Sequence, residues 1–176
     1  MRIAMIGATG LIGRQLWPLL EARHELLVLG RRPSGATCEK LGRMDEWPAL
    51  LAGERLDCAI STLGTTWKKT GSWEKFAAVD RDAVLAFARA AHAAGARHFL
   101  AVSSSGADPA SRNAYLRLKG EVEEALGARL ILRGSLERYA GIDAGLVARG
   151  MAALAEQSEP GLFRHHNREI RTLALS

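Results

Sequence analysis

The sequence of 176 residues predicts an α/β fold built on a doubly wound parallel sheet. Three observations lead to this prediction. An apolar run over residues 2–6 has the composition of a buried strand and ends in a glycine-rich turn. Apolar residues at helical spacing over 11–22 then lead to a second apolar run, 25–30. The alternation of strands and helices continues along the chain, and units of this kind build a parallel sheet covered by helices on both faces.

The later elements follow from the same two periodicities. Residues 33–54 carry only a weak pattern and are expected to hold a short strand and a short helix. Gly95 ends the longest helix, because glycine is common just beyond a helix C-terminus. The other expected elements are a strand over 57–63, a helix within 73–94, a strand over 98–103, a helix over 112–126, a strand over 129–133, and helices over 144–157 and 168–175. Since no clear linker separates them, residues 1–176 are expected to form a single domain.

Composition argues against several classes of protein. The net charge of +5 comes mostly from scattered arginines and not from a basic block with interleaved aromatic residues, so nucleic-acid binding is not expected. The sequence has no apolar run near the roughly 20 residues of a membrane span. Of the two cysteines, Cys58 lies in an apolar run and is expected to be a core thiol, and neither has zinc-ligand spacing. These features predict a cytoplasmic protein without a metal site.

The glycine-rich segment after the first strand is the first candidate functional site. Gly7 permits a tight turn, Gly10 lets a pyrophosphate approach the backbone, and Gly13 lets the following helix pack closely on the strand. The helix N-terminus adds free N–H groups and a positive dipole. The residues expected to cradle the phosphates are Gly7, Ala8, Thr9, Gly10, Leu11, Ile12, Gly13 and Arg14. The alternative is a glycine-rich turn that binds no ligand.

The residues after the second strand bear on the choice of dinucleotide. NAD-binding proteins usually have an acidic residue there, which accepts a hydrogen bond from the ribose 2′-hydroxyl. Here Gly30 is followed by Arg31 and Arg32. A carboxylate repels a 2′-phosphate, whereas a guanidinium binds it through two hydrogen bonds. The expected cofactor is therefore NADP(H), with Arg14 adding positive charge. The alternative is that these arginines are solvated surface residues.

Tyr115 and Lys119 form the candidate catalytic pair. Four residues apart on an expected helix, they share one face. A lysine ammonium near a phenol favours the phenolate, so the tyrosine can donate a proton to a carbonyl oxygen or accept one from an alcohol. Lys119 is also expected to hold the nicotinamide ribose. The fifth strand ends in serines, and either Ser104 or Ser105 is expected to hydrogen-bond the substrate oxygen, the alternative being that these serines cap a turn.

Taken together, these segments resemble the short-chain dehydrogenase/reductases, and more closely the atypical Tat-interacting-protein-like oxidoreductases. The resemblance rests on GATGLIG, GRRP, STLGTTWKKTGS, VDRD, VSSSGADPASRNAYLRLKGEVEEAL and NREIRTLA. It implies a Rossmann-type fold. It also implies that Leu63 and Gly64 line the adenine–ribose half of the cofactor, that Asp45 approaches the adenine, and that Asp80 lies on the helix beside the cofactor cleft.

The sequence departs from this family in two places. Gly134 follows Arg133 where such proteins usually have a proline, which bears on the loop at the nicotinamide side. The part of the chain after Lys119 is also shorter than in relatives, so the fold is expected to carry a shortened C-terminal substrate region.

Two functions remain open on this reading. The first is an NADP(H)-dependent oxidoreductase, of the carbonyl reductase or alcohol dehydrogenase type, that acts on a small molecule whose identity the sequence does not give. The second is a non-catalytic NADP(H)-binding sensor or interaction module. In either case a homodimer is expected, because the helices within 73–94 and over 112–126 are apolar enough to pack against a partner.

Overall fold

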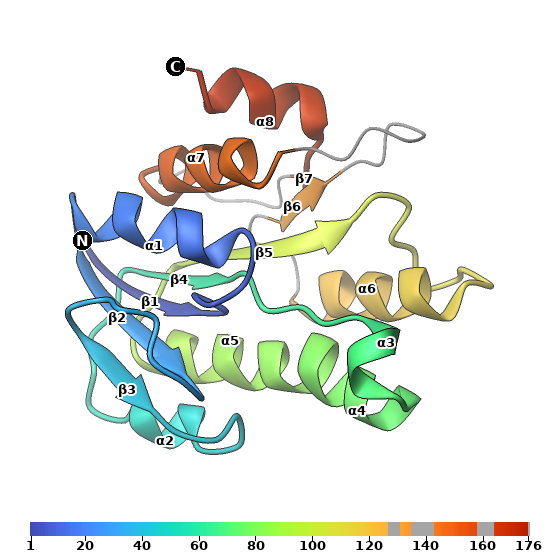
Figure 1. Ribbon diagram of the computed structural model, residues 1–176, viewed down its shortest axis with the longest axis horizontal. Coiled ribbons are helices and arrows are strands. Elements are labelled where there is room, and N and C mark those ends of the chain that lie inside the picture. The colour runs from blue at the N-terminus through green and yellow to red at the C-terminus, as the bar shows by residue number, and fades with distance from the viewer. Residues whose placement is uncertain (127–130, 135–142, 158–163, 176) are drawn as a thin grey trace.

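The strands form one parallel sheet, which a computed structural model describes over residues 1–126, 131–134, 143–157 and 164–175 (Figure 1). Within these ranges seven strands follow the order β3-β2-β1-β4-β5-β6-β7. Their bounds are β1 Arg2–Ile6, β2 Glu25–Gly30, β3 Glu39–Leu41, β4 Cys58–Ser61, β5 His98–Ser104, β6 Ile131–Gly134 and β7 Arg164–His165. Each neighbouring pair is parallel, which confirms the predicted fold class. The strand order reverses between β1 and β4, and ligands of such sheets bind in the crevice at the carboxyl ends beside this point.

Helices cover both faces of the sheet (Figure 1). In the view of Figure 1, α1 and α7 lie above the sheet with α8 outside them, while α2, α5 and α6 lie below it. The helical elements are α1 Gly13–Glu21, α2 Trp47–Leu50, α3 Trp67–Thr70, α4 Trp73–Ala77, the π-helical turn η1 Ala78–Asp82, α5 Ala83–Ala93, α6 Ala114–Ala125, α7 Ala144–Ala155 and α8 Asn167–Leu173. Over the described ranges, none of these helices is long and apolar enough to cross a membrane.

The central strand β1 is buried on both faces, which explains its continuous apolar sequence. Ile3 and Met5 join the hydrophobic cluster on the side of α1 and α7, where Met151 packs. Ile6 lies on the opposite side, in the cluster that contains Phe87 of α5. The sheet is therefore held between two apolar layers, and polar side chains are left to the ends of the strands.

Several elements differ from the sequence-based expectations. The helix expected within 73–94 contains the π-helical turn η1, so that α4, η1 and α5 follow one another without a break. A π turn accommodates one additional residue and changes which residues face the sheet. Helix α1 begins at Gly13, because residues 11–12 belong to the preceding loop. Neither α3 nor the two-residue β7 was predicted, and residues 129–130 of the expected sixth strand lie outside the described residues.

Candidate functional site

The glycine loop connects β1 to α1 and depends on two of its glycines for its shape. Gly7 has a φ of 87°, and a Cβ there would lie 2.6 Å from the backbone nitrogen of Leu63. A Cβ on Gly13 would lie 2.1 Å from the carbonyl oxygen of Gly7. Gly10 is exposed, and its N–H donates to that same carbonyl oxygen at 2.9 Å. Gly7 and Gly13 thus bring loop, strand and helix together, and Gly10 faces the space in front of them.

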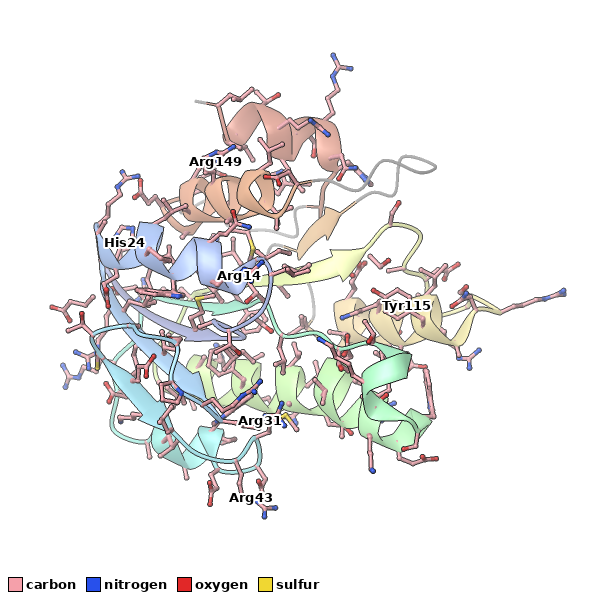
Figure 2. All side chains as sticks on the ribbon, viewed as in Figure 1. Arg14, His24, Arg31, Arg43, Tyr115 and Arg149 are labelled. Carbon is pink, nitrogen blue, oxygen red and sulfur yellow. The ribbon has the colours of Figure 1, made fainter. Side chains whose placement is uncertain are left out.

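A groove runs from this loop to the residues that follow β2. The loop contributes Gly7, Ala8 and Thr9. The other lining residues are Val28, Leu29, Gly30, Arg31, Arg32, Ser34, Trp47 and Leu63. Because β1 and β2 are adjacent parallel strands, the groove lies at their carboxyl ends, where the fold is expected to bind its ligand. Figure 2 shows Arg31 at the end of β2 and Arg14 on α1. Arg14 is exposed, and among the described residues it is not one that lines the groove.

Asp45, which the family resemblance places near the adenine, is not among the described residues that line this groove. Its carboxylate pairs with Arg43, with 3.0 Å between Nε and Oδ1. The hydrogen bond from Arg43 is the main cause that lowers the pKa of the Asp45 carboxyl. Trp47 lines the groove instead, and its indole N–H donates to the carbonyl oxygen of Gly42 at 3.1 Å. Trp47 lies in a stretch whose sequence pattern is weak, so its place in the groove is not predicted by the sequence alone.

Tyr115 and Lys119 lie one turn apart on α6. The side chain of Asn113 caps this helix and accepts hydrogen bonds from the N–H groups of Tyr115 and Leu116 at 3.0 and 3.2 Å. Tyr115 is 40% exposed, and its ring meets the edge of Phe76 with centroids 5.9 Å apart. The Lys119 ammonium lies 6.0 Å from the centre of the Tyr115 ring. A positive charge therefore lies beside an accessible phenol.

Lys119 also forms a buried ion pair with Asp80. Its Nζ lies 2.7 Å from Asp80 Oδ1, and both side chains are almost entirely out of water. The other carboxylate oxygen of Asp80 accepts from the N–H of Thr65 at 2.8 Å. Asp80 lies in η1 and among the described residues is not one that lines the groove. In the structure Asp80 is therefore the partner of Lys119, which the family resemblance did not indicate.

The loop after β4 links the groove to this ion pair. Leu63 lines the groove, and a Cβ on Gly64 would lie 3.7 Å from Asp80 Oδ1. Thr65 then donates its N–H to Asp80. Three consecutive residues thus connect the candidate cofactor site to the partner of Lys119.

The serines at the end of β5 have different surroundings. Ser103 donates its hydroxyl to Oε1 of the buried Glu123 at 2.7 Å, and both side chains line one small cavity with Asp80 and Lys119. The Ser104 side chain is buried, with its hydroxyl 3.5 Å from the carbonyl oxygen of Ser105. Ser105 is half-buried. Ser104 is the last residue of β5 and Ser105 follows it, so both lie at the carboxyl edge of the sheet, and the choice between them stays open.

Three comparisons with known proteins bear on this site. Residues 3–121 match the family described as the NAD dependent epimerase/dehydratase family. Protein FMP52-1, mitochondrial, from Scheffersomyces stipitis is 34% identical over 134 residues, which cover 70% of this chain and 59% of that protein. Protein HTATIP2 from Rattus norvegicus is 44% identical over 81 residues, 46% of this chain and 32% of that protein. The chain therefore matches less than two thirds of the length of either relative.

A solved structure supports the fold. MoeE5 in complex with UDP-glucuronic acid and NAD superimposes with a TM-score of 0.71 at 15% identity, over 94% of this chain and 76% of that chain. At such low identity the likeness concerns the fold alone.

The comparisons also decide two expectations from the sequence. The expected cytoplasmic location is wrong as stated, since fungal relatives of this chain are named as mitochondrial proteins. The resemblance to the atypical short-chain dehydrogenase/reductases is confirmed by the relatives found. With more than half of its residues matched by the family and the glycine loop and groove arranged at the carboxyl edge of its sheet, the chain belongs to the NAD dependent epimerase/dehydratase family.

Proposed function

We propose that the chain is an NADP(H)-dependent oxidoreductase of the carbonyl reductase or alcohol dehydrogenase type. The observation that carries this proposal is the pairing on α6 of an accessible Tyr115 with a buried, charged Lys119. The pair belongs to a chain whose family binds a nicotinamide cofactor. A phenol beside an ammonium is suited to moving a proton to or from a substrate oxygen.

The groove lies where a dinucleotide would bind in this fold, at the carboxyl ends of β1 and β2. Gly10 is exposed at the turn into α1, and the N-terminus of this helix would offer N–H groups to a pyrophosphate there. Arg31 and Arg32 line the adenosine side of the groove, where two guanidinium groups favour a 2′-phosphate. When bound, the nicotinamide supplies or accepts the hydride.

The chain's own residues supply orientation and the proton. Tyr115 donates a proton to the substrate oxygen in reduction and accepts it in oxidation. Lys119 lies beside the Tyr115 ring, and Asp80 keeps the lysine side chain in place. Ser104 or Ser105 holds the substrate oxygen beside Tyr115. The substrate itself is a small molecule with a carbonyl or hydroxyl group.

The experiment is a fluorescence titration of the full chain with NADPH and with NADH. We expect tighter binding of NADPH, and Arg31→Asp should weaken it by about 1.5–3 kcal/mol, the scale of a hydrogen bond between charged groups. Arg43→Asp is the matched control. Arg43 has the same charge as Arg31, but it pairs with Asp45 and is not among the described residues that line the groove. Equal affinity of the wild type for the two cofactors would refute the preference. A screen of carbonyl compounds for NADPH oxidation follows.

One observation favours a second candidate function, an NADP(H)-binding sensor without catalysis. Lys119 already has a carboxylate partner 2.7 Å away, so part of its charge is compensated before any substrate arrives. A sensor would bind NADPH but would not oxidise it with any of the carbonyl compounds screened. Its association with another protein would change when NADPH is bound.

A further inference from the structure

One carboxylate oxygen accepts several hydrogen bonds from the loop that follows the two arginines. Glu39, the first residue of β3, accepts hydrogen bonds through Oε1 from the N–H groups of Ser34, Gly35 and Ala36, at 2.7, 3.0 and 3.2 Å. The hydroxyl of Ser34 donates to the same oxygen. Gly35 permits this arrangement, because its φ of 99° is one that glycine adopts without strain.

Consecutive N–H groups that converge on one point form an anion site. In this loop the anion is supplied by the chain itself. Burial raises the pKa of the Glu39 carboxyl, but the hydrogen bonds from Ser34, Ala36 and Gly35 outweigh it and lower that pKa overall. Glu39 therefore remains ionised at neutral pH, and its charge is spread over four donors.

The held loop forms one wall of the cofactor groove. Ser34 lines the groove together with Arg31 and Arg32, which precede it by only three and two residues, respectively. A guanidinium binds a phosphate through two hydrogen bonds at a smaller cost in entropy when its backbone is already held in place. The backbone bond from the N–H of Gly42 to the carbonyl oxygen of Gly30, at 2.9 Å, holds the chain before these arginines, and the contact with Glu39 holds it after them.

We propose that Glu39 is a positioning residue that determines the preference for NADP(H) over NAD(H). By filling the ring of N–H groups of Ser34–Ala36, it orders the loop so that Arg31 and Arg32 face the 2′-phosphate. Its own negative charge would by itself oppose a phosphate, but ordering of the two cationic side chains outweighs this repulsion. The inference rests on the proposed use of NADP(H).

The test compares Kd values of the full chain for NADPH and NADH. Glu39→Ala should weaken NADPH binding about tenfold or more, equivalent to the loss of one or two hydrogen bonds to a charged group. NADH binding should change less than about twofold, since it lacks the 2′-phosphate and uses the same glycine loop. NADH binding also serves as the check that the variant is folded. Glu39→Gln keeps one acceptor oxygen and should lose a smaller part of the preference.

Glu21→Ala is the matched control. Glu21 Oε1 accepts from the N–H of Thr37 at 2.7 Å, so it holds the same loop, but Thr37 is not among the described residues that line the groove. This variant should keep the wild-type ratio of the two Kd values. If Glu39→Ala and Glu21→Ala reduce the preference for NADPH over NADH equally, the preference depends only on the general stability of the loop and the inference is wrong.

The other outcomes separate the two proposals. A wild type that prefers NADPH, together with a Glu39→Ala variant of unchanged or increased preference, overturns the role of Glu39 and leaves the proposed function intact. A wild type without preference overturns both. If Glu39→Ala does not fold, Glu39→Gln decides, because an unchanged ratio in that folded variant contradicts the inference.

Discussion

Burying the Lys119–Asp80 ion pair costs free energy, and the main effect of the pair is to hold the Lys119 side chain in one position. Removing two charges from water consumes much of their mutual attraction, so such pairs contribute little net stability. Removing one partner is different, because it leaves an uncompensated charge and costs about 3–5 kcal/mol. The pair here joins η1 to α6, and Thr65 adds the loop after β4. It therefore fixes the position of the Lys119 ammonium group relative to the loop after β4.

Tyr115→Phe separates catalysis from binding at the scale of one atom. The variant keeps the ring that packs on Phe76 and loses only the hydroxyl. Loss of a positioned general acid costs about 10²–10⁴-fold in rate, so NADPH oxidation with a substrate found by screening should fall by that factor. NADPH affinity should stay within about twofold, because Tyr115 is not among the described residues that line the groove. Steady-state rates and fluorescence titration measure the two effects. An unchanged rate would remove Tyr115 from the mechanism.

At the scale of elements, the junction of β1 and α1 predicts different outcomes for two glycines. Gly13→Val would place a Cβ 2.1 Å from the Gly7 carbonyl oxygen, a backbone atom that cannot move aside cheaply. We expect a loss of about 1–3 kcal/mol or more in the free energy of unfolding. In Gly10→Val the nearest atom is 3.2 Å from the Cβ and the position is exposed, so the fold should survive.

Cofactor binding should then fail in Gly10→Val for a local reason. The new side chain projects into the space expected for the pyrophosphate, and NADPH affinity should fall while the urea midpoint stays near that of the wild type. A well-folded Gly10→Val protein with wild-type NADPH affinity would show that the loop is not the phosphate site. A Gly13→Val protein of wild-type stability would contradict the packing argument.

The elements that could be predicted are those whose own residues show their burial as a continuous apolar run or a regular apolar spacing. The bounds of β1 and β2 agree with the predicted 2–6 and 25–30, because both strands are buried on both faces and read as unbroken apolar runs. The two-residue β7 could not be predicted, since its pairing with β6 comes from the sheet and not from its own sequence. The π turn likewise carries no periodicity of its own.

The candidate site divides in the same way. Gly7, Arg31 and Tyr115 were identified because motif spacing places them, and the structure brings the first two to one groove. The pairing of Lys119 with Asp80 and the contacts of Glu39 join residues whose meeting depends on the folded chain. Asp45 and Trp47 show most clearly what the sequence does not predict. Both lie in the weakly patterned stretch, and of the two it is Trp47 that lines the groove.

For the molecule as a whole, a small charge network ties the edge of the sheet together away from the groove. Glu54 accepts from Arg2 of β1 at 2.6 Å and from Lys40 of β3 at 2.7 Å. It therefore links two strands that flank β2.

Assembly of the chain into a homodimer through the α4–η1–α5 segment and α6 stays a prediction. Light scattering tests it, because a dimer has twice the 19.0 kDa mass of one chain.

The Glu54 network predicts how the stability of the molecule depends on pH. The hydrogen bond from Lys40 is the largest cause that lowers the pKa of the Glu54 carboxyl, and Arg2 adds to it against the effect of burial. A carboxyl whose pKa is lower in the folded than in the unfolded state stabilises the fold above its ordinary pKa of 4.5. This contribution is lost as the pH falls through the lowered, folded-state value.

Glu54→Gln should therefore be less stable than the wild type at pH 7, by about 1 kcal/mol given the partly exposed partners, and the difference should shrink as the pH falls below 4.5. Urea unfolding at neutral and acidic pH measures this. Glu25→Gln is the control, since Glu25 pairs with the same Arg2 at 3.2 Å but is 76% exposed, so it should match the wild type throughout. A Glu54→Gln deficit that stays constant from pH 7 to acid would mean that the network stabilises the edge by packing and not by charge.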